Sequence, residues 1–390
     1  MKMVLAGYGT RGDTEPFAAV GRELLRRGHD VCMAVAPELV GFLELAELDA
    51  VPFGPESLAS GRNRTIQDPV TGVVDEQECL SRAMVQWGTT LTALANGADL
   101  LITGRIEQGL AANVAEYYGI PQATLHFFPG AHLPLSGWAG PVTEEAEAAQ
   151  RRALGLPEVT EHSTRSLEIQ AYDALCFPEL AAEWADGDGW RPFVGALTLE
   201  LPTEADDEVL SWIAEGTPPI YFGFGSGVWL PNAAQTVGAI SVACARLGKR
   251  ALFCSGASDF NDAPHSDHVK VVGAVNHSAV FPACRAVVHQ GGAGTTAAGM
   301  RAGIPTLILW HPINDQRIWA DAVRRLKVGS GRAFSVSNLG SLVADLRSIL
   351  DPQCITRARE VAAQMTKPAL SVASAADLLE DAGRMGRVGA

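Results

Sequence analysis

The fold is decided by the stretch Val287-Val288-His289-Gln290-Gly291-Gly292-Ala293-Gly294-Thr295-Thr296, an apolar run that gives way to glycines and then to helix formers. This pattern predicts a strand, a tight turn and the first turn of a helix. The free N–H groups and the positive dipole end of such a helix attract an anion, and glycines let the backbone approach that anion closely. The stretch therefore predicts a site for a phosphate group.

Two further turns have the same character. One is Gly223-Phe224-Gly225-Ser226-Gly227, after the apolar run 220–222, and the other is Gly7-Tyr8-Gly9-Thr10-Arg11-Gly12-Asp13, after the apolar run 3–6. Three such turns predict a ligand that carries a diphosphate. Gly7, Gly9 and Gly12 also match the dinucleotide fingerprint, but that fingerprint needs an acidic residue at the end of the second strand. Here the run 31–35 ends in Ala36-Pro37, so NAD or flavin is the weaker interpretation and we expect no cofactor.

Composition limits the class of protein. A chain of 390 residues predicts two domains, and 47% hydrophobic with 19% charged residues indicates a packed globular protein. The formal charge of −14 argues against a nucleic-acid partner. The seven cysteines form no CxxC pair and are expected to be reduced. No leader or membrane-length apolar segment is visible, so we expect a cytoplasmic protein without an integral membrane segment, either a monomer or a weak homo-oligomer.

Strand-like and helix-like runs alternate along both halves of the chain, which predicts two doubly wound α/β domains. The acidic, Gly/Pro-punctuated segment 185–207 marks the boundary, giving domains 1–195 and 196–390. The end of the chain is mostly helical and is expected to pack back on the first domain. The segment 128–142 reads as a long loop, either a wall for an acceptor or a plain surface excursion.

Several polar residues follow predicted strands, where open α/β sheets bind ligands. Asp13 is either a general base or the N-cap of the next helix. His289 is placed to reach the predicted phosphate. Asp315 and Gln316 either bind sugar hydroxyls or begin a helix, and these two roles are compatible. His265 and His268 lie in a polar loop without cysteine partners, so no metal site is expected.

Other motifs exclude competing classes of enzyme. The chain has no G-x-x-x-x-G-K-[ST] sequence, which argues against a P-loop ATPase, and no G-x-S-x-G elbow, which argues against an α/β-hydrolase.

Together these motifs resemble glycosyltransferase family 1 of GT-B fold, in particular the actinobacterial enzymes that glycosylate antibiotics and glycolipids, including the vancomycin-group glycopeptide glycosyltransferases. The segments that carry the resemblance are Gly9–Pro16, Phe222–Ser226, Val275-Asn276-His277, His289–Thr296 and Asp315-Gln316. It implies two Rossmann-like domains facing across a cleft, with the acceptor bound by the first and the nucleotide sugar by the second. The implied reaction is an inverting, metal-independent transfer from a TDP- or UDP-sugar to a hydroxyl of a small lipophilic or natural-product acceptor.

The resemblance also implies roles for residues of this chain. Asp13 corresponds to the catalytic base of the family. Thr10 and Arg11 would line the cleft beside it and belong to the diphosphate site. Val275 and Asn276 fall on the segment that reads the nucleotide base, and Asp315 and Gln316 on the pair that binds the donor sugar. The rest of the diphosphate site would consist of His289, Gly292, Ala293, Gly294, Thr295 and Ser226.

Two points stay open in this interpretation. The family often has two histidines where this chain has His289-Gln290, so the effect of Gln290 on donor affinity or activity is undetermined. For the acceptor, Phe127, Phe128 and Trp138 are candidate walls, although core packing explains each of them equally well. The alternatives in other classes are a non-catalytic nucleotide- or lipid-binding module and a nucleotide-sugar epimerase.

Overall fold

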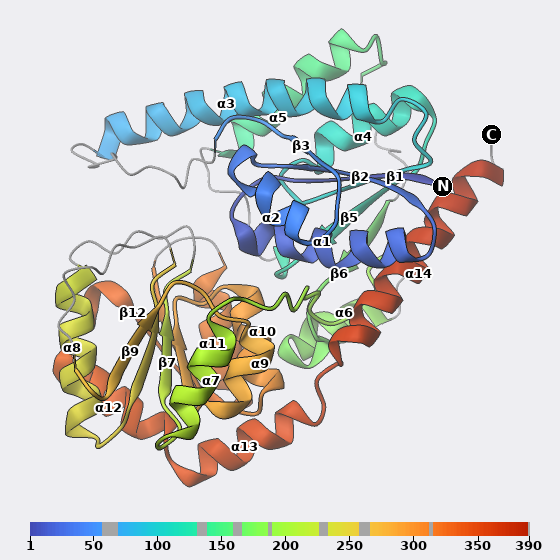
Figure 1. Cartoon of the computed structure of the whole chain (residues 1–390). Coiled ribbons are helices and arrows are strands. Elements are labelled where there is room, and N and C mark those ends of the chain that lie inside the picture. The colour runs from blue at the N-terminus through green and yellow to red at the C-terminus, as the bar shows by residue number, and fades with distance from the viewer. Residues whose placement is uncertain are drawn as a thin grey trace. The chain divides into compact units, whose positions relative to one another are not determined.

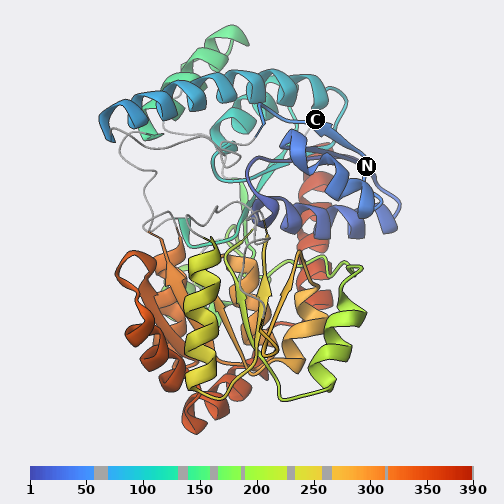
Figure 2. The ribbon, with the colours of Figure 1, turned by 60° about the vertical axis from the view of Figure 1, so that its left-hand side comes forward.

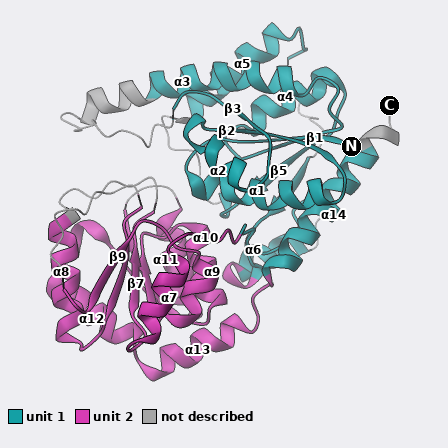
Figure 3. Cartoon of the chain, viewed as in Figure 1, with its two compact units in different colours: residues 1–174, 178–199, 368–390 teal, residues 175–177, 200–367 magenta. Residues whose placement is uncertain are grey.

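The computed structural model describes residues 1–56, 69–130, 139–158, 166–185, 189–225, 233–256, 266–311 and 315–388. Two compact units are present (Figure 3). Unit 1 consists of residues 1–174, 178–199 and 368–390, and unit 2 of residues 175–177 and 200–367.

Unit 1 contains a six-stranded parallel sheet with the order β3-β2-β1-β4-β5-β6 (Figure 1). Its strands are β1 (Lys2–Gly7), β2 (Asp30–Val35), β3 (Ala50–Pro52), β4 (Leu100–Thr103), β5 (Gln122–His126) and β6 (Leu167–Gln170). Its helices are α1 (Arg11–Arg26), α2 (Val40–Leu45), α3 (Pro69–Leu94), α4 (Gln108–Tyr118), α5 (Ala139–Ala153), α6 (Pro178–Ala185) and α14 (Pro368–Val388). This strand order is that of the doubly wound fold.

Unit 2 contains a second sheet with the order β12-β11-β10-β7-β8-β9. Read in the opposite direction, β9-β8-β7-β10-β11-β12, this is the strand order of unit 1 with β7 in the place of β1. Its strands are β7 (Ile220–Gly223), β8 (Ala251–Cys254), β9 (Val269–Val272), β10 (Ala286–His289), β11 (Thr306–Trp310) and β12 (Gly329–Ala333). Its helices are α7 (Asp206–Ala214), α8 (Ala233–Arg246), α9 (His277–Val280), α10 (Ala293–Arg301), α11 (Gln316–Leu326), α12 (Leu339–Ile349) and α13 (Pro352–Ala362). Figure 2 shows helices on both faces of this sheet. The predicted pair of doubly wound α/β halves is confirmed.

The strands read as continuous apolar runs because helices cover both faces of each sheet. In unit 1, Val4 and Leu101 belong to a buried cluster that also contains Trp87 of α3. In unit 2, Phe222 and Val288 are buried with residues of α8 and α12. Each fully buried side chain of this size contributes about 1.5–3 kcal/mol.

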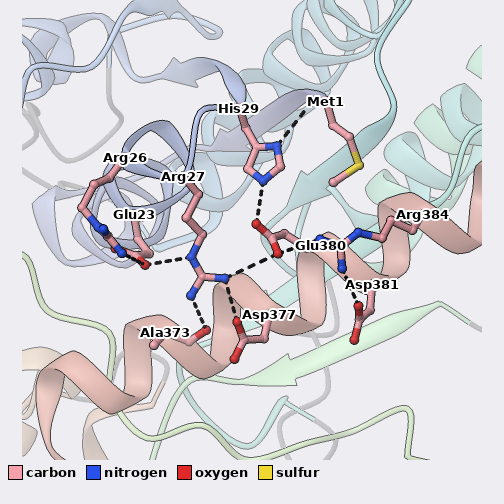
Figure 4. Close-up of polar contacts among 10 residues, drawn as sticks. All are labelled: Met1, Glu23, Arg26, Arg27, His29, Ala373, Asp377, Glu380, Asp381 and Arg384. Atoms are coloured by element: carbon pink, nitrogen blue, oxygen red, sulfur yellow. Dashed lines mark hydrogen bonds and ion pairs between the residues drawn. The ribbon is translucent and has the colours of Figure 1, made fainter.

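The last helix, α14, belongs to unit 1 and packs against α1 and β4. Polar contacts reinforce this packing (Figure 4). Arg27 donates to Glu23 (Nε to Oε1, 2.8 Å) and to Asp377 of α14 (Nη1 to Oδ1, 2.6 Å). Glu380 of α14 contacts His29 (Oε1 to Nε2, 2.7 Å). Hydrogen bonds from Arg26 and Arg27 lower the pKa of Glu23 to about 2, so this carboxylate is charged at neutral pH.

Some local expectations were wrong. The last residues of the segment 128–142 are helical and not part of a loop, because α5 begins at Ala139. The role of N-cap considered for Asp13 falls to Thr10, because α1 begins at Arg11 and Thr10 and Asp13 form a capping box ahead of Pro16. Among the described helices, none is long and apolar enough to cross a membrane.

Candidate functional site

Ligands of doubly wound sheets bind at the carboxyl edge, where the strand order reverses. This reversal lies between β1 and β4 in unit 1 and between β7 and β10 in unit 2. Asp13 lies in the first turn of α1, just after β1, and His289 is the last residue of β10. The two residues that sequence reasoning placed in the chemistry therefore lie at the switch points of the two sheets.

Asp13 is held by the turn that begins α1. Its Oδ2 accepts hydrogen bonds from the backbone N–H of Thr10 (2.7 Å) and from the Thr10 hydroxyl (3.0 Å). Asp13 is thus the third residue of the helix and not its N-cap, which is Thr10. Burial raises the pKa of Asp13 above its ordinary value, against the opposing effect of the two hydrogen bonds from Thr10. A raised pKa makes this carboxylate a stronger base.

A second carboxyl group, missed from the sequence, lies at the same switch point. Glu107 follows β4, is 2% exposed, and accepts a hydrogen bond from the backbone N–H of Tyr8 in the first glycine turn (Oε1, 3.0 Å). Burial, with a further contribution from the charge of Asp13, raises the pKa of Glu107 to about 7. Two carboxyl groups with raised pKa values at one sheet edge, one of them buried, are typical of a functional site.

The other predicted residues of unit 1 are placed as follows. Arg11 forms an ion pair with Glu15 (3.2 Å) and lies over the ring of Phe42. Phe127 packs edge-on against Phe17 of α1, with ring centroids 5.6 Å apart. Phe128 is half-buried beyond the end of β5. Trp138 lies outside the described residues.

His289 is fully buried, and its Nδ1 accepts a hydrogen bond from the backbone N–H of Gly291 (3.0 Å). Burial lowers the pKa of His289 to about 3, so the ring is neutral and its single proton lies on Nε2. Among the described residues, Nε2 is buried without a hydrogen-bond partner. A buried N–H group without a partner is costly, so this nitrogen is a candidate hydrogen-bond donor to a ligand.

The glycine turns of unit 2 lie close together. Gly292 is the N-cap of α10, so the N–H groups of Ala293, Gly294 and Thr295 belong to the first turn of that helix, where they have no partner within the helix. Gln290 packs between the turns: a Cβ atom at Gly225 would lie 2.4 Å from its Nε2. Its Oε1 is buried without a hydrogen-bond partner. Ser226 lies outside the described residues.

Asp315 and Gln316 lie at the start of α11, beside the turn that follows β10. Asp315 Oδ2 accepts from Trp319 Nε1 (2.9 Å), and Gln316 Oε1 accepts from the backbone N–H of His311 (2.8 Å). These contacts fix both side chains. Gly291, at φ +108°, brings the two loops together, because a Cβ atom there would lie 3.0 Å from the backbone oxygen of Gln316.

Val275 and Asn276 occupy the end of a segment that follows β9. Val275 is buried in the core of unit 2. Asn276 is the N-cap of α9, where its Oδ1 accepts from the backbone N–H of Ser278 (3.1 Å), and its own backbone N–H donates to Asp206 Oδ1 (2.8 Å). The side chains of both residues and the backbone N–H of Asn276 are therefore engaged within the fold.

Comparisons with known proteins agree with this arrangement. The family model "Glycosyltransferase family 28 N-terminal domain" matches residues 3–91, and "Erythromycin biosynthesis protein CIII-like, C-terminal domain" matches residues 255–385. An "uncharacterized glycosyltransferase" of Mycobacterium tuberculosis is 54% identical over 99% of this chain and 100% of its own length. The vancomycin aglycone glucosyltransferase of Amycolatopsis orientalis is 28% identical over 98% of each chain.

Solved structures show the same fold. The calicheamicin glycosyltransferase CalG4 aligns with a TM-score of 0.75 at 17% identity over 98% of each chain. The glycosyltransferase VinC, in complex with dTDP, aligns with a TM-score of 0.68 at 18% identity over 99% of this chain and 100% of that one. The chain thus belongs to the glycosyltransferases of GT-B fold.

Proposed function

We propose that this glycosyltransferase moves a hexose from a TDP- or UDP-sugar to a hydroxyl group of a small lipophilic or natural-product acceptor, with inversion at the anomeric carbon. The observation that carries the donor half of the proposal is the buried Nε2–H of His289, which lies at the switch point of unit 2 and has no hydrogen-bond partner. It is flanked by the first turn of α10, which attracts phosphate oxygens. The dTDP bound to the related VinC fold supports a nucleoside diphosphate as the ligand.

Charge develops on the diphosphate as the bond from its oxygen to the anomeric carbon breaks. The neutral His289 ring and the N–H groups of residues 293–295 would stabilise that charge by hydrogen bonding, without a bound metal ion. Asp315 and Gln316, fixed by Trp319 and His311, would position the sugar. The backbone of Val275 and Asn276 would contact the nucleotide base.

Asp13 would accept the proton of the acceptor hydroxyl as that oxygen bonds to the anomeric carbon. Both of its hydrogen bonds to Thr10 end on Oδ2, so Oδ1 is the oxygen that would take the proton. The role of Thr10 is then to orient Asp13. Attack from the side opposite the leaving diphosphate inverts the anomeric centre.

The test is calorimetric binding of TDP, UDP, GDP and NAD in the presence of EDTA, followed by transfer assays with the nucleotide sugar that corresponds to the tightest ligand. We expect metal-free binding of TDP or UDP, and a loss of transfer of at least 100-fold in Asp13→Asn with nucleotide affinity retained. Binding of NAD alone, or no binding of any nucleotide, would refute the proposal. An incubation with donor alone separates transfer from epimerisation.

A further inference from the structure

Arg105 is a half-buried cation to which the described residues supply no counter-ion. It lies just beyond β4, at the same edge of the sheet as Glu107, and burial lowers its pKa. Among the described residues, its guanidinium group has no ion pair and no hydrogen bond. Its side chain lies against Gly130, where a Cβ atom would be 2.8 Å from Arg105 Cδ. The position of this side chain therefore depends on the glycine beside it.

His126 lies next to Arg105. Thr103 of β4 lies opposite Thr124 of the parallel strand β5. Arg105 is two residues beyond Thr103 and His126 is two residues beyond Thr124, so both lie at the same end of this strand pair. His126 is 9% exposed, and its buried Nε2 has no hydrogen-bond partner in the described part of the chain. Burial lowers the pKa of His126 to about 4, and the charge of Arg105 acts in the same direction, so the ring is neutral.

Glu168 is the carboxylate whose charge opposes the lowering of the pKa of His126, and it is paired with residues other than Arg105. Glu168 of β6 accepts hydrogen bonds from Gln108 Nε2 (3.1 Å) and from Arg191 Nε (2.7 Å). Its charge is thus already compensated by a different arginine. A guanidinium group that is partly removed from water without an anion is unfavourable, and a planar two-oxygen anion is the partner that fits it.

We propose that Arg105 and His126 bind an anionic group of the acceptor, a carboxylate or a phosphate monoester. This inference rests on the proposed function. The donor diphosphate has its own cradle in unit 2, whereas these two residues share a sheet edge with Asp13 and Glu107. Phe127 and Phe128, which follow His126 in the chain, supply apolar surface beside the anion site. The acceptor is then an amphipathic molecule with a hydroxyl to glycosylate and an acid group to anchor it.

The experiment measures binding of 4-hydroxyphenylacetate, its uncharged methyl ester, inorganic phosphate and TDP to the full-length protein. We expect the acid to bind at least tenfold more tightly than the ester, and this preference to disappear in Arg105→Gln and to weaken in His126→Leu. TDP affinity should be unchanged in both variants. The exposed Arg22→Gln, also in unit 1, is the control and should behave as wild type.

Thermal unfolding without ligand distinguishes a binding role from a structural one. Because Arg105→Gln removes an uncompensated charge, its melting temperature should equal or exceed that of wild type. Three results would overturn the proposal: equal binding of acid and ester by wild type, no saturable binding of either anion, or weaker TDP binding in Arg105→Gln, which would assign Arg105 to the donor. Failure of the proposed function is seen separately, as absence of TDP and UDP binding by wild type.

Discussion

The buried imidazole of His289 permits a test that separates its two nitrogen atoms. Asn at this position places its amide oxygen near the position of Nδ1. That oxygen can still accept the hydrogen bond from the N–H of Gly291, but the side chain has no donor at the position of Nε2. Gln does the reverse, since its amide NH2 group reaches the position of Nε2. A hydrogen bond to a charged phosphate contributes about 1.5–3 kcal/mol. His289→Asn should therefore weaken TDP binding by about 10- to 150-fold, and His289→Gln should recover part of that loss.

The pH dependence sharpens the test. Because burial lowers the pKa of His289 to about 3, the ring is neutral throughout pH 5.5–8 and donates only through Nε2–H. Protonation of TDP itself changes its affinity in this range, but it does so equally for wild type and variant. The ratio of their dissociation constants should thus stay constant.

Calorimetry with EDTA at pH 5.5, 6.5 and 8 measures this ratio, and thermal unfolding verifies that each variant is folded. A folded His289→Asn protein that binds TDP as tightly as wild type would refute the assignment of Nε2 to the phosphate. A ratio that grows as the pH falls would instead show that the ring binds as a cation.

Three further tests, two of them with a matched control variant, concern the stability of the fold. A rise in the pKa of Glu107 from 4.5 to about 7 corresponds to about 3 kcal/mol of stability, present below pH 4.5 and lost as the pH rises to 7. The difference in unfolding free energy between wild type and Glu107→Gln, measured with urea, should therefore shift by most of this amount between pH 5 and 8. Gly291→Ala should lower the free energy of unfolding by about 1–3 kcal/mol and weaken TDP binding, because φ is +108° at this residue. The control is Gly294→Ala, which has open space around its Cβ position. It should unfold at the same urea concentration as wild type or at a higher one. Arg27→Ala should cost about 1–3 kcal/mol by loss of its contacts to α14, and the exposed Arg26→Ala, which loses its contacts to Glu23, should cost less. Equal unfolding midpoints would contradict a stabilising role for this network.

The sequence predicts those parts of the site that are local in the chain. Asp13 and His289 can be found because each lies within a few residues of an apolar run and a glycine turn. Glu107 cannot be found in this way, because it contacts Tyr8 from 99 residues away, through the adjacency of β1 and β4. Its one signal is that it follows a buried strand, and this becomes informative only when the strand order is known.

The missed strands have a similar cause. β12 reads Gly-Ser-Gly-Arg-Ala, which has no apolar pattern, and β6 contains only two aliphatic residues. Both lie at the edges of their sheets, where pairing with the neighbouring strand defines them more clearly than their composition does. Local composition therefore carries little information about them.

Asp13 belongs both to the start of a helix and to the proposed chemistry, and the two roles use different oxygens. The hydrogen bonds from Thr10 that begin α1 also fix the direction of the carboxylate, so the fold itself orients the proposed base. Replacement by alanine would remove the capping box together with the base, and loss of helix stability could then be mistaken for loss of catalysis. Asparagine keeps an oxygen that accepts both hydrogen bonds and removes only the proton acceptor. Unchanged transfer in Asp13→Asn would therefore leave this residue with a purely structural role.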